Sequence, residues 1–325
     1  MKSDVNSFYH KLHKLTALLT VGFVTVSMCG CGEEKTFQSN APSSTITPAV
    51  KGSRDNTPVC LVPTAPGEVV YSNNYAQVDA SNSSEGYVVV KYLGESPKVK
   101  LQIVGPDQVT YTYDLSSIPT DEVFPLQSGN GEYLVNVYEN IEGTQYSMAF
   151  STVVDVNLSD EFLPFLYPNQ YVTFSSSSLA IAKGEELAYS CNSDLDVVSA
   201  VYNFMIQNVT YDYDEAETVQ SGYLPDVDEV LTTGKGICFD YAALMTAMLR
   251  SQQIPTRMEI GYAGTAYHAW LSTYIEDVGW VNGMIEFDGT KWSLMDPTFA
   301  SNMKKKSELK SFIGDGSNYS VKYIY

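Results

Sequence analysis

The sequence is poor in basic residues and in histidine. It holds 19 lysines and arginines against 38 aspartates and glutamates, and its formal net charge is −19. Because nucleic-acid binding depends on basic side chains that neutralise phosphates, we exclude nucleic acid as a partner. The chain has only three histidines, which argues against a histidine-rich metal site, and no D-x-D-x-D-G calcium-loop pattern occurs in it. We therefore predict neither a metal nor a cofactor.

Long apolar runs are also missing. The clearest one, residues 15–28, is shorter than the roughly 20 residues that a membrane-spanning helix needs. It follows Lys11 and Lys14 and ends in "MCGC", and this order of basic, apolar and small residues is typical of a secretory signal. The motif resembles the lipobox of bacterial lipoproteins, with Cys31 at the lipidated position. We predict a signal peptide over residues 1–30 and a location outside the cytoplasm, with the membrane reached only through a lipid on Cys31.

Cysteine is scarce, with five in the chain. Residues 31–58 are rich in Ser, Thr, Pro and Asn and cannot bury enough apolar surface to order themselves, so we predict a disordered tether there. Removal of the signal and lipidation of Cys31 would leave three thiols, Cys60, Cys191 and Cys238. The first two could form a disulfide outside the cytosol. Cys238 would then be an odd thiol, which needs an explanation in an exported protein.

Two regions with different sequence patterns follow the tether. Residues 59–158 read as short alternating strands with Gly, Pro, Asn and Asp between them at about ten-residue spacing, which predicts an all-β, immunoglobulin-like sandwich. This part holds no motif that carries chemistry. Residues 159–325 contain helical periodicity followed by a run of strand-like segments, the order that is typical of an α+β domain.

Two helices stand out in the second part. The segment "SDLDVVSAVYNFMIQNV" is amphipathic, and Ser193 or Asp194 can cap its start. The second helix begins near Cys238 and runs to about Ser251. We predict a long acidic loop between them and antiparallel strands after the second helix.

Cys238 lies where "GKGIC" enters this second helix. The unpaired N–H groups at a helix start carry partial positive charge, which stabilises a thiolate. Gly234 and Gly236 leave room for the backbone of a substrate. Without the signal peptide the chain keeps one histidine, His268, which can act as the base, and Asp296 can orient its ring. A helix nucleophile, a strand base and a strand carboxylate in this order predict a Cys-His-Asp catalytic set.

Three segments in order resemble the bacterial transglutaminase-like superfamily: "GKGICFDYAALMTAMLRSQQIPTR", "GYAGTAYHAWLSTYI" and "KWSLMDPTF". The resemblance covers about residues 193–300 and implies a papain-like α+β fold for the second domain. It implies Cys238 as the nucleophile, His268 as base and then acid, and Asp296 as the residue that orients the histidine. The reaction is not fixed by the resemblance, because members include protein crosslinkers, peptidases, amidases and inactive relatives.

Five further residues are weaker candidates. Tyr211 precedes the second helix and could donate a hydrogen bond to an oxyanion, although the backbone N–H of Cys238 is the safer donor. Four residues beside the motifs are candidates for the wall of a substrate groove: Gly236, Asp240, Tyr267 and Trp270. Asp240 could instead serve the helix start, and Trp270 could instead belong to the core.

The sequence thus predicts a surface-anchored thiol hydrolase or acyl transferase that acts on amide bonds of a peptide or protein. Hydrolysis is favoured, because water is abundant and no site for another acyl acceptor can be read from the sequence. Three alternatives stay open: a protein-crosslinking transglutaminase, a cell-wall or cyclic-peptide amidase, and a non-catalytic lipoprotein that binds peptides or mediates adhesion. The substrate and the oligomeric state are not predicted.

Overall fold

A computed structural model describes residues 49–282, 285–287, 292–294, 298 and 319–325. The predicted signal peptide, Cys31 and Asp296 lie outside the described residues. No helix in the described ranges combines the length and the apolarity that a membrane span requires. Residues 50–325 cluster as one compact unit. The predicted division into two domains near residue 158 therefore stays a prediction.

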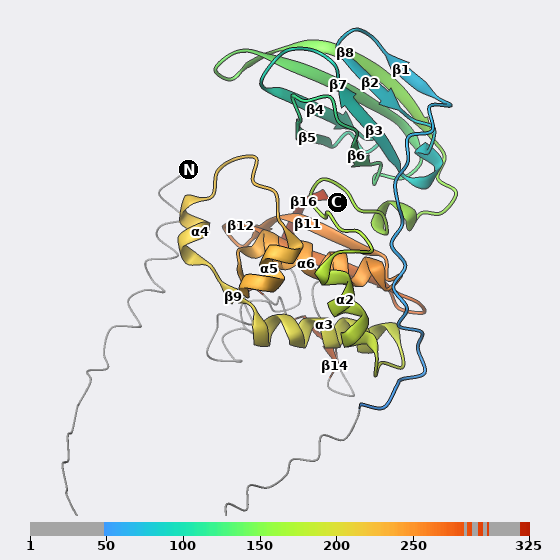
Figure 1. The fold of residues 1–325 in the computed structure, drawn as a ribbon, viewed down its shortest axis with the longest axis vertical. Coiled ribbons are helices and arrows are strands. Elements are labelled where there is room, and N and C mark those ends of the chain that lie inside the picture. Colours follow the sequence, from blue (N-terminus) through green and yellow to red (C-terminus); the bar gives the residue numbers. More distant parts are fainter. Residues whose placement is uncertain (1–48, 283–284, 288–291, 295–297, 299–318) are drawn as a thin grey trace, which may run out of the picture. The chain divides into compact units, whose positions relative to one another are not determined.

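The first half of this unit consists of two four-stranded antiparallel sheets (Figure 1). The first sheet has the order β1-β2-β3-β6 and the second the order β5-β4-β7-β8. Their strands are β1 (Val70–Ser72), β2 (Ala76–Asp79), β3 (Tyr87–Tyr92), β4 (Val99–Val104), β5 (Thr110–Leu115), β6 (Glu122–Pro125), β7 (Gly131–Glu142) and β8 (Gln145–Val156). A 3-10 turn, η1 (Ser83–Glu85), lies between β2 and β3, and a second, η2 (Leu163–Phe165), follows β8.

Alternation of side chains explains why these two sheets face each other. In β4, every second residue from Val99 is buried, as expected for a strand with one face toward a core. Val78 and Val90 of the first sheet and Leu101 of the second belong to one core cluster. The predicted all-β region is therefore made of paired sheets with a shared core, and its immunoglobulin-like type stays a prediction.

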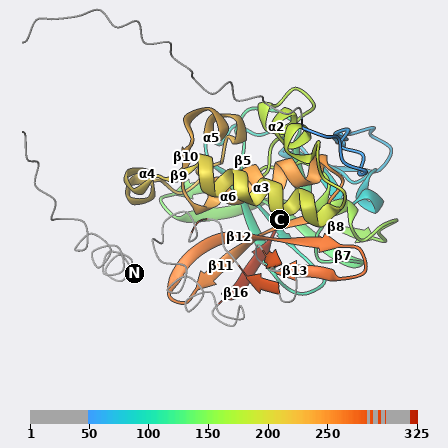
Figure 2. The same ribbon diagram turned by 90° about the horizontal axis from the view of Figure 1, so that it is seen from below.

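The second half combines helices with an antiparallel sheet of order β13-β12-β11-β16 (Figure 2), which confirms the α+β prediction. The helices are α2 (Leu179–Ala188), α3 (Asp194–Asn208), α4 (Tyr213–Thr218), α5 (Val227–Thr233) and α6 (Cys238–Ser251). The sheet strands are β11 (Thr256–Ala263), β12 (Ala266–Ile275), β13 (Gly279–Asn282) and β16 (Tyr319–Ile324). Two small pairs complete it, β9 (Thr210–Tyr211) with β10 (Lys235–Gly236), and β14 (Ile285–Phe287) with β15 (Trp292–Leu294).

The two predicted helices are confirmed. Helix α3 begins after Ser193, whose hydroxyl accepts a hydrogen bond from the Asp196 N–H while the Asp196 carboxylate accepts one from the Ser193 N–H. Helix α6 runs over the predicted residues and packs against α2, α3, α5, β11 and β12. Gly184 of α2 makes this close packing feasible, because a Cβ atom there would lie 3.3 Å from the Met248 carbonyl oxygen.

The predicted acidic loop was wrong in part, because it contains the short helices α4 and α5. Each begins at an aspartate that caps it: Asp212 accepts from the Glu215 N–H, and Asp226 accepts from the Asp228 and Glu229 N–H groups. The acidic side chains of this segment therefore include the caps that start these two helices.

The predicted tether also ends earlier than expected. Residues 50–58 lie along the helical half, where Gly52 N–H donates to the Tyr189 carbonyl at 2.9 Å and the Arg54 Nε lies 2.6 Å from an Asp194 carboxylate oxygen. At the end of this stretch, Val59 N–H donates to the Ser251 carbonyl at 2.8 Å. Hydrogen bonds of polar side chains and backbone groups order this segment. The prediction of disorder, which was based on its lack of apolar residues, was therefore wrong for residues 50–58. We call residues 50–59 the strap.

Candidate functional site

Cys238 is the first residue of α6, and its side chain is half-buried. Three residues shape the turn before it. Gly234 ends α5 in the left-handed conformation at φ +63°, Gly236 belongs to β10, and Ile237 is extended at φ −92° and ψ 179°. None of the cysteines in the described residues is bridged, so Cys238 is a free thiol and the suggested Cys60–Cys191 disulfide is not formed. A free thiol in the first helical turn has the placement that stabilises a thiolate.

Tyr211 lies beside this turn. Strand β9 runs parallel to β10, with Tyr211 opposite Gly236. The Thr210 N–H donates to the Gly234 carbonyl and the Asp212 N–H to the Gly236 carbonyl, both at 2.9 Å. The structure therefore brings Tyr211 close to the approach to Cys238, as the sequence suggested. Its role as an oxyanion donor stays a prediction.

Asp240 does not line a groove, which corrects one expectation. Its side chain is 0% exposed. One carboxylate oxygen accepts from the Ile237 N–H at 2.8 Å, and the other accepts from the Tyr223 hydroxyl at 2.7 Å. Burial raises the pKa of Asp240 to about 6, although both hydrogen bonds oppose this shift. Asp240 therefore fixes the start of α6 from inside the protein.

The burial of Asp240 also explains why residue 236 is a glycine. A Cβ atom at this position would lie 2.6 Å from the Cβ of Asp240, closer than side-chain carbons approach each other. Gly236 is itself buried. The glycine thus admits the buried Asp240, and its expected place in the wall of a substrate groove is not supported by exposure.

His268 lies near the start of β12 and is 5% exposed. Its ring stacks toward that of Trp270, with centroids 6.0 Å apart and planes at 21°. Trp270 is 5% exposed and, with Ser272, donates a hydrogen bond to the buried Glu259 carboxylate. Trp270 is therefore a core residue and not the wall of an open groove. Core membership was the alternative that the sequence left open.

Tyr267 is the exposed member of the set, at 58%. Side chains alternate along a strand, so Tyr267 and Ala269 occupy one face of β12 and His268 and Trp270 the other. Although most of the residue is exposed, partial desolvation raises the pKa of the Tyr267 hydroxyl, and negative charge on Tyr323, Tyr262 or Cys238 would raise it further. Tyr267 therefore lies within electrostatic reach of Cys238, which suits its expected place in a groove. The union of Cys238, His268 and Asp296 in one catalytic group stays a prediction.

Sequence reasoning missed Tyr223. It lies 17 residues before its partner Asp240, in a segment without periodicity, and only the fold joins them. A tyrosine in a mostly polar loop is the only signal that could have pointed to it.

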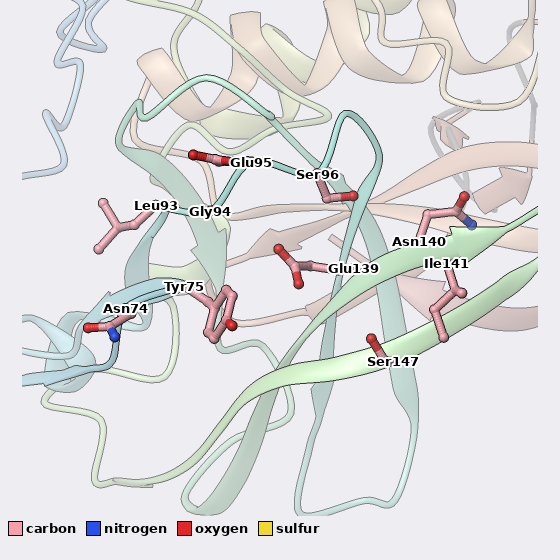
Figure 3. Close-up of a pocket in the computed structure, with 10 residues that line it drawn as sticks. All are labelled: Asn74, Tyr75, Leu93, Gly94, Glu95, Ser96, Glu139, Asn140, Ile141 and Ser147. Carbon is pink, nitrogen blue, oxygen red and sulfur yellow. The ribbon is translucent and has the colours of Figure 1, made fainter.

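A hollow of about 570 Å³ lies in the β-rich half (Figure 3). Its lining comes from the strand ends and turns around β2, β3, β7 and β8, and Figure 3 shows the side chains of Tyr75 and Glu139 turned into it. The Tyr92 hydroxyl donates to the Glu139 carboxylate behind it. None of the sequence-predicted site residues lines this hollow. Within the described part of the chain, no group of three or more His, Cys, Asp or Glu side chains is arranged to hold a metal ion.

Residues 182–283 match the family model of the transglutaminase-like superfamily. The match assigns this segment to the superfamily. The transglutaminase-like match begins within α2 and extends through α6, β11 and β12, so it includes Cys238 and His268 and ends before Asp296. The β-rich half lies outside it.

Individual proteins are also similar to parts of this chain. The UPF0252 protein MJ1282 of Methanocaldococcus jannaschii is 23% identical over 180 residues, which span 52% of this chain and 45% of that protein. The aligned part thus covers less than half the length of this relative. Among solved structures, a candidate cysteine protease from Cytophaga hutchinsonii is 20% identical, with a TM-score of 0.35 over 71% of this chain and 79% of its own. The periplasmic domain of TgpA from Pseudomonas aeruginosa is 15% identical, with a TM-score of 0.31 over 71% of this chain and 95% of its own.

Proposed function

We propose that this protein is a surface-anchored thiol hydrolase that cleaves amide bonds in a peptide or protein. The observation that carries the proposal is the free, half-buried thiol of Cys238 at the first position of a 14-residue helix, within a transglutaminase-like match. A helix start supplies both a stabilised thiolate and backbone N–H donors for an oxyanion.

The proposed reaction proceeds through a thioester. The Cys238 sulfur attacks the amide carbonyl carbon, and the negative charge moves to the carbonyl oxygen, where the Cys238 N–H can stabilise it. His268 takes the thiol proton and gives it to the leaving amine as the C–N bond breaks, with Asp296 orienting the ring. Water then attacks the thioester, which releases the carboxylic acid and restores the thiol.

A protein-crosslinking transglutaminase differs only in the last step, where an amine replaces water. A non-catalytic lipoprotein that binds peptides is the alternative from another class. In each case we place the protein outside the cytoplasm, with Cys31 carrying the lipid.

Turnover with two acceptors separates these alternatives. The purified protein is incubated with a mixed peptide library, with and without a fluorescent primary amine, and products are followed by mass spectrometry. We expect new carboxyl termini from the wild type, complete loss in Cys238→Ala, and loss of at least about a hundredfold in His268→Asn, because general acid–base catalysis contributes that much. The Cys60→Ala variant serves as the matched thiol control and should keep full activity.

Amine incorporation without cleavage would favour the crosslinking alternative. If Cys238 reacts with iodoacetamide no faster than a simple alkyl thiol near neutral pH, the thiol-enzyme proposal is wrong and the binding alternative takes its place.

A further inference from the structure

The loop between α4 and α5, residues 219–225, lies against the start of α6. The Tyr223 hydroxyl donates to Asp240 at 2.7 Å, and its ring centroid lies 6.4 Å from that of Phe239, with the planes at 63°. Phe239 and Asp240 are the two residues that follow Cys238. We call residues 219–225 the Tyr223 loop.

One carboxylate joins three parts of the site. Asp240 belongs to α6, its first oxygen holds Tyr223, and its second holds the N–H of Ile237, the residue before Cys238. The side chain is completely buried, so a partner that is removed is not replaced by bulk water. Leaving a buried charged acceptor without its donor costs more than an ordinary hydrogen bond contributes. The Asp240 carboxylate therefore fixes both the position of the Tyr223 loop and the backbone conformation just before Cys238.

The Tyr223 loop also lies against the β-rich half. Gly222 adopts φ +91°, and a Cβ atom there would lie 3.1 Å from a carboxylate oxygen of Asp114 in β5. Asp114 is held in turn, since Lys100 Nζ lies 2.5 Å from its carboxylate and Gln170 donates to its carbonyl at 2.6 Å. A side chain at position 222 would meet both an unfavourable backbone conformation and this anchored aspartate.

Negative charge surrounds Asp240. Burial is the main cause of its raised pKa, and the carboxylates of Glu215 in α4 and Glu229 in α5 add to it. Burial and the bond to Asp240 raise the pKa of the Tyr223 hydroxyl well above its usual value, so Tyr223 stays a donor over the physiological range. The Tyr223 hydroxyl and the Ile237 N–H are thus the two donors that favour the charged form of Asp240.

We propose that Tyr223 and Asp240 are positioning residues of the Cys238 site, and that the Tyr223 loop is a flap held beside Cys238 by α6 on one side and β5 on the other. The inference rests on the proposed function, since it assigns the flap to a reactive thiol. It gives the β-rich half a role in the site, because β5 supplies one of the two anchors of the flap.

The test compares Tyr223→Phe with Tyr189→Phe, which removes a hydroxyl from an exposed tyrosine at the end of α2. Amide hydrogen exchange is measured over residues 219–225, and iodoacetamide alkylation is measured separately at Cys238 and Cys60. Loss of one buried hydrogen bond to a charged acceptor predicts at least about tenfold faster exchange in the Tyr223 loop. Because the flap then opens more often, Cys238 should be alkylated a few times faster while Cys60 is unchanged, and Tyr189→Phe should change neither.

Unchanged exchange in the Tyr223 loop would overturn the proposal that the Tyr223–Asp240 hydrogen bond holds the flap. Faster exchange with an unchanged Cys238 rate would overturn the positioning role. If wild-type Cys238 reacts like a simple thiol, the proposed function fails. The exchange rates would still show whether the hydrogen bond between Tyr223 and Asp240 holds the loop. Gly222→Ala tests the β5 anchor independently and should also speed Cys238 alkylation; an unchanged rate would remove β5 from the site.

Discussion

The three thiols in the described part of the chain share a residue type but have different surroundings. Cys60 is half-buried and Cys191 is buried, and burial raises the pKa of both thiols. Cys238 is half-buried like Cys60, yet it begins a helix after a glycine and an extended isoleucine. Exposure alone therefore does not separate a candidate nucleophile from a packing cysteine. The backbone conformation around Cys238, at the start of a helix, distinguishes it from Cys60.

Alkylation should show the largest contrast between these thiols. At pH 7 we expect iodoacetamide to modify Cys238 at least about tenfold faster than Cys60, because a helix start stabilises the reactive thiolate while burial disfavours it at Cys60. Mass spectrometry of digests taken over time measures both sites in one sample. Cys238→Ser should remove the fast phase and Cys60→Ser should leave it. Equal alkylation rates at Cys238 and Cys60 would contradict this prediction.

The carboxylates near the thiols offer the next test. The pKa of Asp240 is raised from 3.8 to about 6, so its contribution to stability is fully present below its unfolded value and is lost as the pH rises through 6. Asp240→Asn cannot titrate. The free energy of unfolding of the variant relative to the wild type should therefore rise by about 3 kcal/mol between pH 3.5 and 7.5, since each pKa unit corresponds to about 1.4 kcal/mol.

Urea unfolding at the two pH values measures this difference. Asp155→Asn is the control, because Asp155 is exposed. A relative stability of Asp240→Asn that is the same at both pH values would contradict the burial argument.

A smaller effect is expected when a side chain is added at Gly236, two residues before Cys238. Gly236→Ala places a Cβ atom 2.6 Å from the Cβ of Asp240, and overpacking of this kind costs about 1–3 kcal/mol. Thermal or urea unfolding gives the loss in stability, and alkylation shows whether Cys238 comes to resemble Cys60. Gly143→Ala is a control at a glycine with φ +54° and open space around it, where only backbone strain of about 1 kcal/mol applies. A loss at Gly236 no larger than at Gly143 would argue against the collision.

The smallest effect concerns the strap beside Cys191. Arg54 contacts Asp194 at 2.6 Å and donates to the Gln252 carbonyl at 2.5 Å. Arg54→Met keeps the apolar stem and should lower the free energy of unfolding by about 1 kcal/mol, since such pairs are partly exposed to solvent. The exposed Lys51 provides the control, and Lys51→Met should be neutral in the same urea titration. Equal effects would show that the strap contributes nothing through Arg54.

Much of the helical half could be predicted from the sequence, because local signals agree with the fold there. The periodicity of α3 with its Ser193 cap, and the start of α6 at Cys238, are local features. The helices α4 and α5 were missed because each has at most seven residues and depends on an aspartate cap within an acidic stretch.

Long-range pairs were beyond sequence reasoning. Nothing local connects Tyr223 with Asp240, and the polar composition of the strap concealed backbone hydrogen bonds to residues more than 130 positions away. The reason for Gly236 was likewise hidden, because it lies in the volume of a buried neighbour and not in the needs of a substrate.

The strap has a mechanical consequence. It is fastened to the end of α6 through the last helical residue, Ser251, and the residue after it, Gln252, while Cys238 is the first residue of the same helix. At 1.5 Å per residue, the two ends of this 14-residue helix are about 20 Å apart. A pulling force applied at residue 50 would reach the strap's bonds to Tyr189 and Asp194 before its bond to Ser251, while Cys238 lies at the other end of α6.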